Sequence, residues 1–252
     1  MVVFDCNLSY GRVVAGGPAK PCETMGELEQ ELERAGIAGG LVYHSAQDTV
    51  GVVTGNDLLS ADLANASRKL WGVWSLLPSC TGEIPSPQDL PAAMRRNGIA
   101  ALRLNPQGHK YMPLPAVLGD YLAMACERNI PIHIDTGCGV TLEQAYAYLS
   151  AFPKLHCILT HADCWPCDRQ LRPFLETFEH VVLDTTYLLT DQGFEAIVRK
   201  YGASRLLFGS GFPACYLGAH MLTLRHSDIS QEDKEAILGG NLERLVKGVD
   251  LT

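Results

Sequence analysis

The sequence has neither of the glycine-rich motifs that bind nucleotide phosphates. G-x-G-x-x-G and G-x-x-x-x-G-K are both absent from the chain. These motifs bring backbone N–H groups against a pyrophosphate, usually directly after a strand. We therefore expect no nucleotide cofactor.

Basic residues and long apolar runs are also scarce. The chain has 20 Lys and Arg against 28 Asp and Glu, and its formal net charge is −8. Nucleic acids and anionic membrane surfaces attract clustered Lys and Arg. No apolar run approaches the roughly 18 residues of a membrane span, and no signal-peptide pattern precedes the first expected strand. We expect a cytoplasmic protein with neither a nucleic-acid nor a membrane partner.

Cysteine, by contrast, is abundant. The chain has nine cysteines, an odd number, and a core of this size needs no disulfide framework. We interpret them as reduced thiols. Hydrophobic residues make up 47% of the chain and charged residues 19%, which is ordinary for a globular protein with an ample core.

Apolar strand patterns alternate with helical patterns along the whole chain. Thr24 with Glu27 and Thr141 with Gln144 form capping boxes that predict helix starts, and Asn56 predicts a further N-cap. The expected strands are 2–4, 39–45, 71–78, 99–106, 130–135, 155–163, 180–187 and 205–213. This alternation, in 252 residues, predicts an α/β protein with a single (β/α)8 TIM barrel over residues 1–252. A doubly wound sheet would usually show a glycine-rich turn after its first strand.

Polar side chains follow the expected strands, where a barrel places its active site. His133 and His161 end two consecutive strands, and Asp184 ends the next one. We take these three as candidate catalytic residues, and the two histidines also as candidate metal ligands. The candidate substrate-binding residues are Arg103, Asn7 and Trp74. Arg103 suits an anionic substrate because its guanidinium binds carboxylates bidentately, although it could equally pair with a neighbouring acid.

Seven segments spread along the chain form a recognisable set. They are FDCNLS, RLNP, IPIHIDTG, ILTHAD, VVLDTTY, FGSGFP and the ending ISQEDKEAILGGNLERLV. Together they resemble the amidohydrolase-related family of metal-dependent hydrolases and decarboxylases, and the resemblance covers the whole chain. It implies a barrel enzyme with a metal site at the strand ends.

The departures from the family pattern fall on the metal ligands. Asn7 and Ser9 stand where the family has its two first-strand histidines, and Gly211 stands where it has an aspartate. Of the five ligand positions, the resemblance leaves His133 and His161. It therefore implies a degenerate site, with zinc or another divalent metal bound weakly or substoichiometrically. Amide and hydroxyl oxygens are weak zinc ligands, and glycine cannot act as a base.

Three functional hypotheses follow. The first is an amidohydrolase-like enzyme that hydrolyses or decarboxylates a small carbonyl or carboxylate compound, with a reduced or absent metal centre. The second is a non-catalytic barrel that binds a ligand in the same place. The third is a Cys/His metal-binding barrel, because Cys164 and Cys167 follow His161 closely. We expect a small and anionic substrate, and the sequence is compatible with a homo-oligomer.

Overall fold

The described residues form one closed barrel of parallel strands surrounded by helices. The computed structural model describes residues 1–13, 21–137, 139–160 and 168–252. Its strands pair in chain order from first to last. They are β1 (Phe4–Tyr10), β2 (Gly39–His44), β3 (Lys69–Ser75), β4 (Ile99–Leu104), β5 (Ile132–Asp135), β6 (Cys157–Thr160), β7 (Val181–Asp184) and β8 (Leu206–Leu207).

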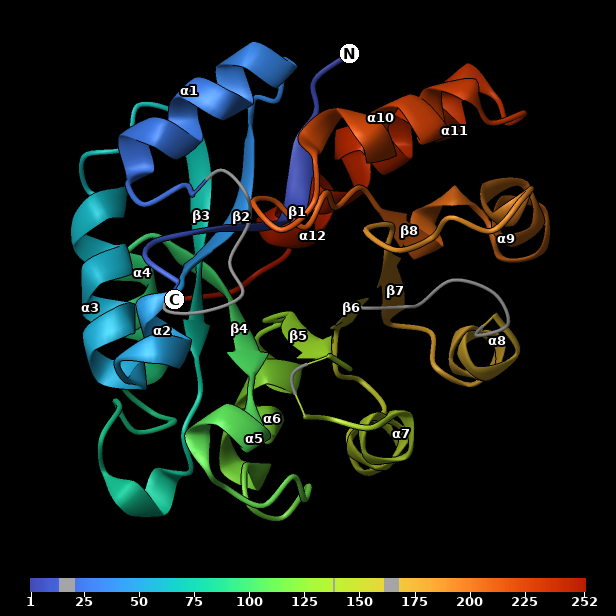
Figure 1. Ribbon diagram of the computed structural model, residues 1–252. Helices are drawn as coiled ribbons and strands as arrows, with labels where there is room; N and C mark the ends of the chain where they lie inside the picture. The colour runs from blue at the N-terminus through green and yellow to red at the C-terminus, as the bar shows by residue number, and fades with distance from the viewer. Residues whose placement is uncertain (14–20, 138, 161–167) are drawn as a thin grey trace.

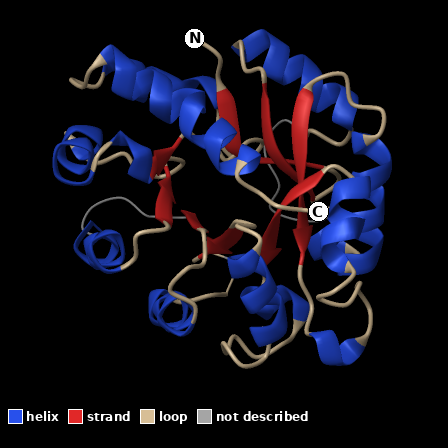
Figure 2. Ribbon diagram, turned by 180° about the vertical axis from the view of Figure 1, so that it is seen from behind, coloured by secondary structure: helices blue, strands red, loops and turns tan. Residues whose placement is uncertain are grey.

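The helices lie outside this sheet, and Figure 2 shows them around the central strands. The longer ones are α1 (Met25–Ala35), α3 (Val52–Leu63), α4 (Leu90–Arg96), α6 (Gly119–Glu127), α7 (Leu142–Ala151), α8 (Asp168–Thr177), α9 (Gly193–Tyr201), α10 (Leu217–His226) and α12 (Asn241–Lys247). The shorter segments are α2 (Ala46–Thr49), η1 (Ser79–Thr81), α5 (Pro106–His109), η2 (Ala203–Arg205), α11 (Gln231–Glu235) and η3 (Ala236–Gly240). In the described part of the chain, none has the length and apolar character needed to cross a membrane.

Hydrogen bonds between the first and last strands close the barrel. The Cys6 N–H donates to the Phe208 carbonyl at 2.8 Å, and the Gly211 N–H donates to the Asn7 carbonyl at 3.1 Å. With these bonds every strand has two neighbours, so the predicted (β/α)8 barrel is confirmed.

Two apolar layers stabilise the barrel. Inside, Phe4, Leu41 and Leu207 pack together with Leu242 of α12, which covers the amino-terminal end of the strands (Figure 1). Outside, alternate strand residues pack against the helices in the larger core. Successive side chains on a strand point to opposite faces, so this division tells which residues face the barrel interior.

Local signals account for several helix starts. The Glu27 N–H donates to the Thr24 hydroxyl at 3.2 Å, and Thr141 with Gln144 forms the second predicted capping box. The prediction for Asn56 is wrong, because α3 begins at Val52 and Asn56 lies inside it. Its side chain is buried and bonds to the backbone of Ser75, so the amide serves a tertiary contact rather than a cap.

Candidate functional site

Asn7 of β1 forms a hydrogen-bonded cluster with Asp184 and Thr186 at the carboxyl end of β7, and Asp184 and Thr186 are buried. The Asn7 amide Nδ2 donates to Asp184 Oδ2 at 2.8 Å and to Thr186 Oγ1 at 3.2 Å. The Thr186 hydroxyl lies 2.8 Å from both carboxylate oxygens, and the Thr186 N–H donates to Oδ1 at 2.9 Å. Burial raises the pKa of Asp184, although these hydrogen bonds act in the opposite direction.

Asp5 is a second buried carboxyl group near this cluster. Its Oδ1 accepts the backbone N–H of Asn7 at 2.9 Å and that of Ser210 at 3.1 Å. Its Oδ2 is buried and accepts no hydrogen bond from the residues described in the structure. Burial raises the pKa of Asp5 to about 7, against the opposing effect of these hydrogen bonds. Asp5 therefore titrates near neutral pH.

His133 lies on the inner face of β5. Its neighbours Ile132 and Ile134 belong to the outer core, so the imidazole faces the barrel interior. The side chain is buried, and Nε2 forms no hydrogen bond with any residue that the structure describes. Burial and the nearby Arg103 charge lower the pKa of His133 to about 3. The imidazole is therefore neutral at pH 7, with one ring nitrogen available for a proton or a ligand.

Arg103 stands beside His133 in the barrel register and is held by an ion pair. Its Nη1 donates to Asp48 Oδ2 at 2.8 Å and to Oδ1 at 3.0 Å. The guanidinium also stacks over the Tyr43 ring, 4.1 Å from its centroid. Arg103 therefore pairs with a neighbouring acid, one of the two roles that the sequence allowed for it. A substrate carboxylate would have to share Arg103 with Asp48.

Asp48 also connects two loops at the carboxyl ends of the strands, and sequence reasoning missed it. It lies on the four-residue helix α2, accepts from Asn105 Nδ2 at 2.7 Å and lies 3.4 Å from His109 Nε2. Burial alone would raise the pKa of Asp48, but these partners and Arg103 hold it below its ordinary value. So short a helix has no periodic pattern. The nearest sequence signal is its position, four residues after the strand that ends at His44.

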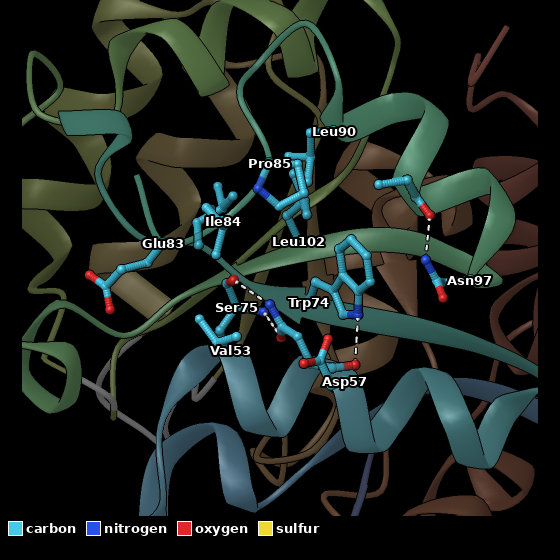
Figure 3. Close-up of a pocket in the computed structure, with 13 residues that line it drawn as sticks. Val53, Asp57, Trp74, Ser75, Glu83, Ile84, Pro85, Leu90, Asn97 and Leu102 are labelled. Carbon is cyan, nitrogen blue, oxygen red and sulfur yellow. Dashed lines mark hydrogen bonds between the residues drawn. The ribbon is translucent and has the colours of Figure 1, made fainter. Parts of the chain in front are cut away.

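Trp74 does not lie with these residues. It belongs to the outer core, and its indole Nε1 donates to the Asn56 carbonyl of α3 at 3.1 Å. Figure 3 shows it lining a cavity between α3 and the segment 83–90. The strand alternation accounts for this position, because Trp71 and Val73 pack with the inner cluster. Trp74 therefore faces away from the barrel mouth.

We tested the described residues for a divalent metal of the kind that the family resemblance implies. No three His, Cys, Asp or Glu side chains among them converge on one point. The Asn7 NH2 group points at Asp184, and an amide nitrogen of this kind donates hydrogen bonds but has no lone pair for a metal. The second predicted ligand, His161, and the cysteines Cys138, Cys164 and Cys167 lie outside the described residues. The donor set that is described does not fit a metal centre.

Gly211 fits this conclusion. Its φ is 67°, and a Cβ built there would lie 2.5 Å from the Thr186 methyl carbon. An aspartate at 211 would therefore collide with Thr186. In this backbone Thr186 and a larger side chain at position 211 are therefore sterically incompatible.

Comparisons with known proteins agree with the fold. Residues 14–247 match the family model Amidohydro_2, described as amidohydrolase. No curated protein matches the sequence. Among solved structures, a putative 2-pyrone-4,6-dicarboxylic acid hydrolase from Pseudomonas putida is 18% identical, with a TM-score of 0.74 and 98% of each chain covered. A 5-carboxyvanillate decarboxylase from Sphingomonas paucimobilis is 14% identical, with a TM-score of 0.74 and 99% of each chain covered. An uncharacterized TIM-barrel protein from Bordetella bronchiseptica is 19% identical, with a TM-score of 0.73 and coverage of 98% of this chain and 99% of the other.

Proposed function

The chain belongs to the amidohydrolase family, and on that premise we propose that it is an enzyme that hydrolyses or decarboxylates a small carboxylate compound without a full metal centre. The observation that carries this proposal is the Asn7–Asp184–Thr186 cluster. The Asn7 amide NH2 group, which has no lone pair for a metal, lies against Asp184. A carboxyl group and a neutral imidazole are then left to act by general acid–base chemistry.

Asp184 is the proposed acid or base. Its pKa is raised toward neutral pH, and a general acid or base is most efficient when its pKa lies near the working pH. Thr186 and Asn7 hold it in one orientation, so it is positioned before the substrate binds. In hydrolysis it would take a proton from water, and in decarboxylation it would deliver one to the carbon that loses carbon dioxide.

His133 is the proposed second group. Its Nε2, which bonds to no residue in the described part of the chain, can donate a hydrogen bond to a substrate oxygen or accept one while the ring stays neutral between pH 5 and 8. His161 would complete the catalytic set as the sequence proposes. Arg103 would attract a substrate carboxylate while Asp48 moves aside or shares the guanidinium.

A specific observation also favours a second candidate, a barrel that binds such a ligand without turnover. The Arg103 and Asp184 side chains already have charged or hydrogen-bonding partners within the chain. A substrate must compete with those partners. The two candidates differ in whether the bound compound is converted to product.

The test combines metal analysis with turnover. The purified protein, with no added metal, would be analysed for bound metals and assayed with 2-pyrone-4,6-dicarboxylate, 5-carboxyvanillate and 2,6-dihydroxybenzoate, the compounds named for its structural neighbours. Released carbon dioxide marks decarboxylation, and loss of the pyrone absorbance marks hydrolysis. We expect turnover that survives a chelator.

Variants then identify the residues. Asp184→Asn and His133→Gln should each lower kcat by about 100-fold or more, the usual contribution of a general acid or base. Asp120→Asn, an exposed carboxylate on α6, is the matched control and should leave kcat unchanged. One tightly bound metal per chain, with activity lost to the chelator, would contradict the metal-free site. Saturable binding without product would favour the second candidate.

A further inference from the structure

The outer face of the barrel carries a cavity that the proposed reaction does not use. It has a volume of about 250 Å³ and lies between α3, β3 and the segment that leads into α4 (Figure 3). Its walls are mainly apolar and include Trp74, Ile84 and Leu90. Drug-sized ligands occupy about 300–1,000 Å³, so this cavity suits a smaller molecule.

The cavity wall beside α3 is held in place by hydrogen bonds. The Trp74 indole N–H donates to the Asn56 carbonyl, and the Asn56 Nδ2 donates to the Ser75 carbonyl at 3.1 Å. Asn56 Oδ1 in turn accepts from Gln47 Nε2 at 3.0 Å. Polar groups of this wall are therefore satisfied within the protein. A ligand would reach part of Trp74, which is 7% exposed, the more open side chains of Val53 and Ile84, and the charges at the rim.

Those charges have one sign. Asp57 and Glu83 line the cavity and are exposed, while none of the described lining residues is Lys, Arg or His. Neither carboxylate forms an ion pair within the described part of the chain. Figure 3 shows Asp57 on the α3 side of the indole, and the Glu83 carboxylate pointing outward. An anion would be repelled here.

We propose that this cavity binds a small organic cation with an apolar body, such as an arylalkylammonium ion. The apolar part lies against Val53, Ile84 and the accessible part of Trp74, and the ammonium group pairs with Asp57 at the rim. An indole also attracts cations directly through its ring face. Glu83 adds to the negative potential around the opening. This site lies on the opposite side of the sheet from His133 and is independent of the proposed reaction.

Three probes of similar shape test the charge requirement. Phenethylammonium carries the proposed cation, 2-phenylethanol is neutral, and 3-phenylpropanoate is an anion. Binding to the full chain would be followed by calorimetry and by tryptophan fluorescence. We expect saturable binding of the ammonium ion, at least 5-fold weaker binding of the alcohol, and none of the carboxylate.

Three variants locate the site. Asp57→Asn should weaken binding of the ammonium ion to the level of the alcohol, while binding of the alcohol itself stays unchanged. Asp120→Asn removes an equal charge elsewhere and should leave binding unchanged. Val53→Phe, at a position 41% exposed on α3, should block the cavity for both probes without disturbing the core. Equal binding of the three probes, or binding unaffected by Asp57→Asn and Val53→Phe, would overturn the proposal.

Discussion

The contact between position 211 and Thr186 can be measured by a double-mutant cycle. In Gly211→Ala the new Cβ lies 2.5 Å from the Thr186 methyl carbon, more than 1 Å inside the roughly 3.5–4.0 Å of an ordinary carbon contact. Overpacking of this kind costs about 1–3 kcal/mol. The left-handed φ of 67° adds about 1–2 kcal/mol for any residue with a Cβ. We expect Gly211→Ala to lower the free energy of unfolding by about 2–5 kcal/mol in total.

A second glycine separates the two contributions. Gly98 has a φ of 69°, and a Cβ there would meet nothing within 4 Å. Gly98→Ala should therefore lose only the conformational part, about 1–2 kcal/mol. Thr186→Ser removes the methyl group but keeps the hydroxyl that contacts Asp184. In the double variant, Thr186→Ser should recover the free energy of unfolding that overpacking costs in Gly211→Ala.

Urea unfolding followed by circular dichroism gives the four free energies of the cycle. We expect a coupling of about 1–3 kcal/mol between positions 186 and 211, since the two residues are in contact. At about 2–4 °C per kcal/mol for a chain of this size, Gly211→Ala should also lower Tm by about 4–20 °C. Additivity within about 0.5 kcal/mol, or equal losses for Gly211→Ala and Gly98→Ala, would refute the steric argument.

Two further predictions concern the carboxyl groups of Asp5 and Asp48. The pKa of Asp5 is raised to about 7 in the folded state, so the folded protein holds a proton that the unfolded chain has lost above pH 4. The pKa shift of about three pH units, at about 1.4 kcal/mol per unit, corresponds to about 4 kcal/mol in the free energy of unfolding. This stabilisation is fully present below pH 4 and disappears as the pH rises through about 7. Unfolding at pH 5 and pH 8 should therefore show a pH dependence that Asp5→Asn reduces, and an unchanged slope would contradict it. Asp48→Asn removes the carboxylate that pairs with the buried Arg103 guanidinium and should cost about 3 kcal/mol. Glu176→Gln in the exposed pair with Lys200 should leave the free energy of unfolding nearly unchanged, and a similar loss in both variants would show that burial of Arg103 contributes little.

The sequence was sufficient for the barrel because its signals are local. Capping boxes such as Thr24 with Glu27 mark helix starts within four residues, and apolar runs mark the buried strands. The strand order and the pairing of Arg103 beside His133 then follow from barrel topology. These parts need no knowledge of distant contacts.

The contacts within the site depended on residues far apart in the chain. Asn56 looks like a cap because its bonds to Ser75, 19 residues away, are invisible in a local window. Asp48 was missed because its partners come from β4 and the following turn, more than 50 residues later. Trp74 was recoverable, since alternation from Trp71 and Val73 places it on the outer face. The roles proposed for His133, His161, Asp184, Arg103 and Asn7 stay predictions.

The overlap between Thr186 and a side chain at 211 also sets an order for any pair of substitutions that would place a carboxylate at that position. Aspartate tolerates the left-handed backbone of Gly211 better than most residues, so the obstacle is the Thr186 methyl group. A chain that gained aspartate first would have a destabilised barrel. A chain that first exchanged Thr186 for a smaller residue would pass through a stable intermediate. The two substitutions are therefore tolerated in one order and not in the other.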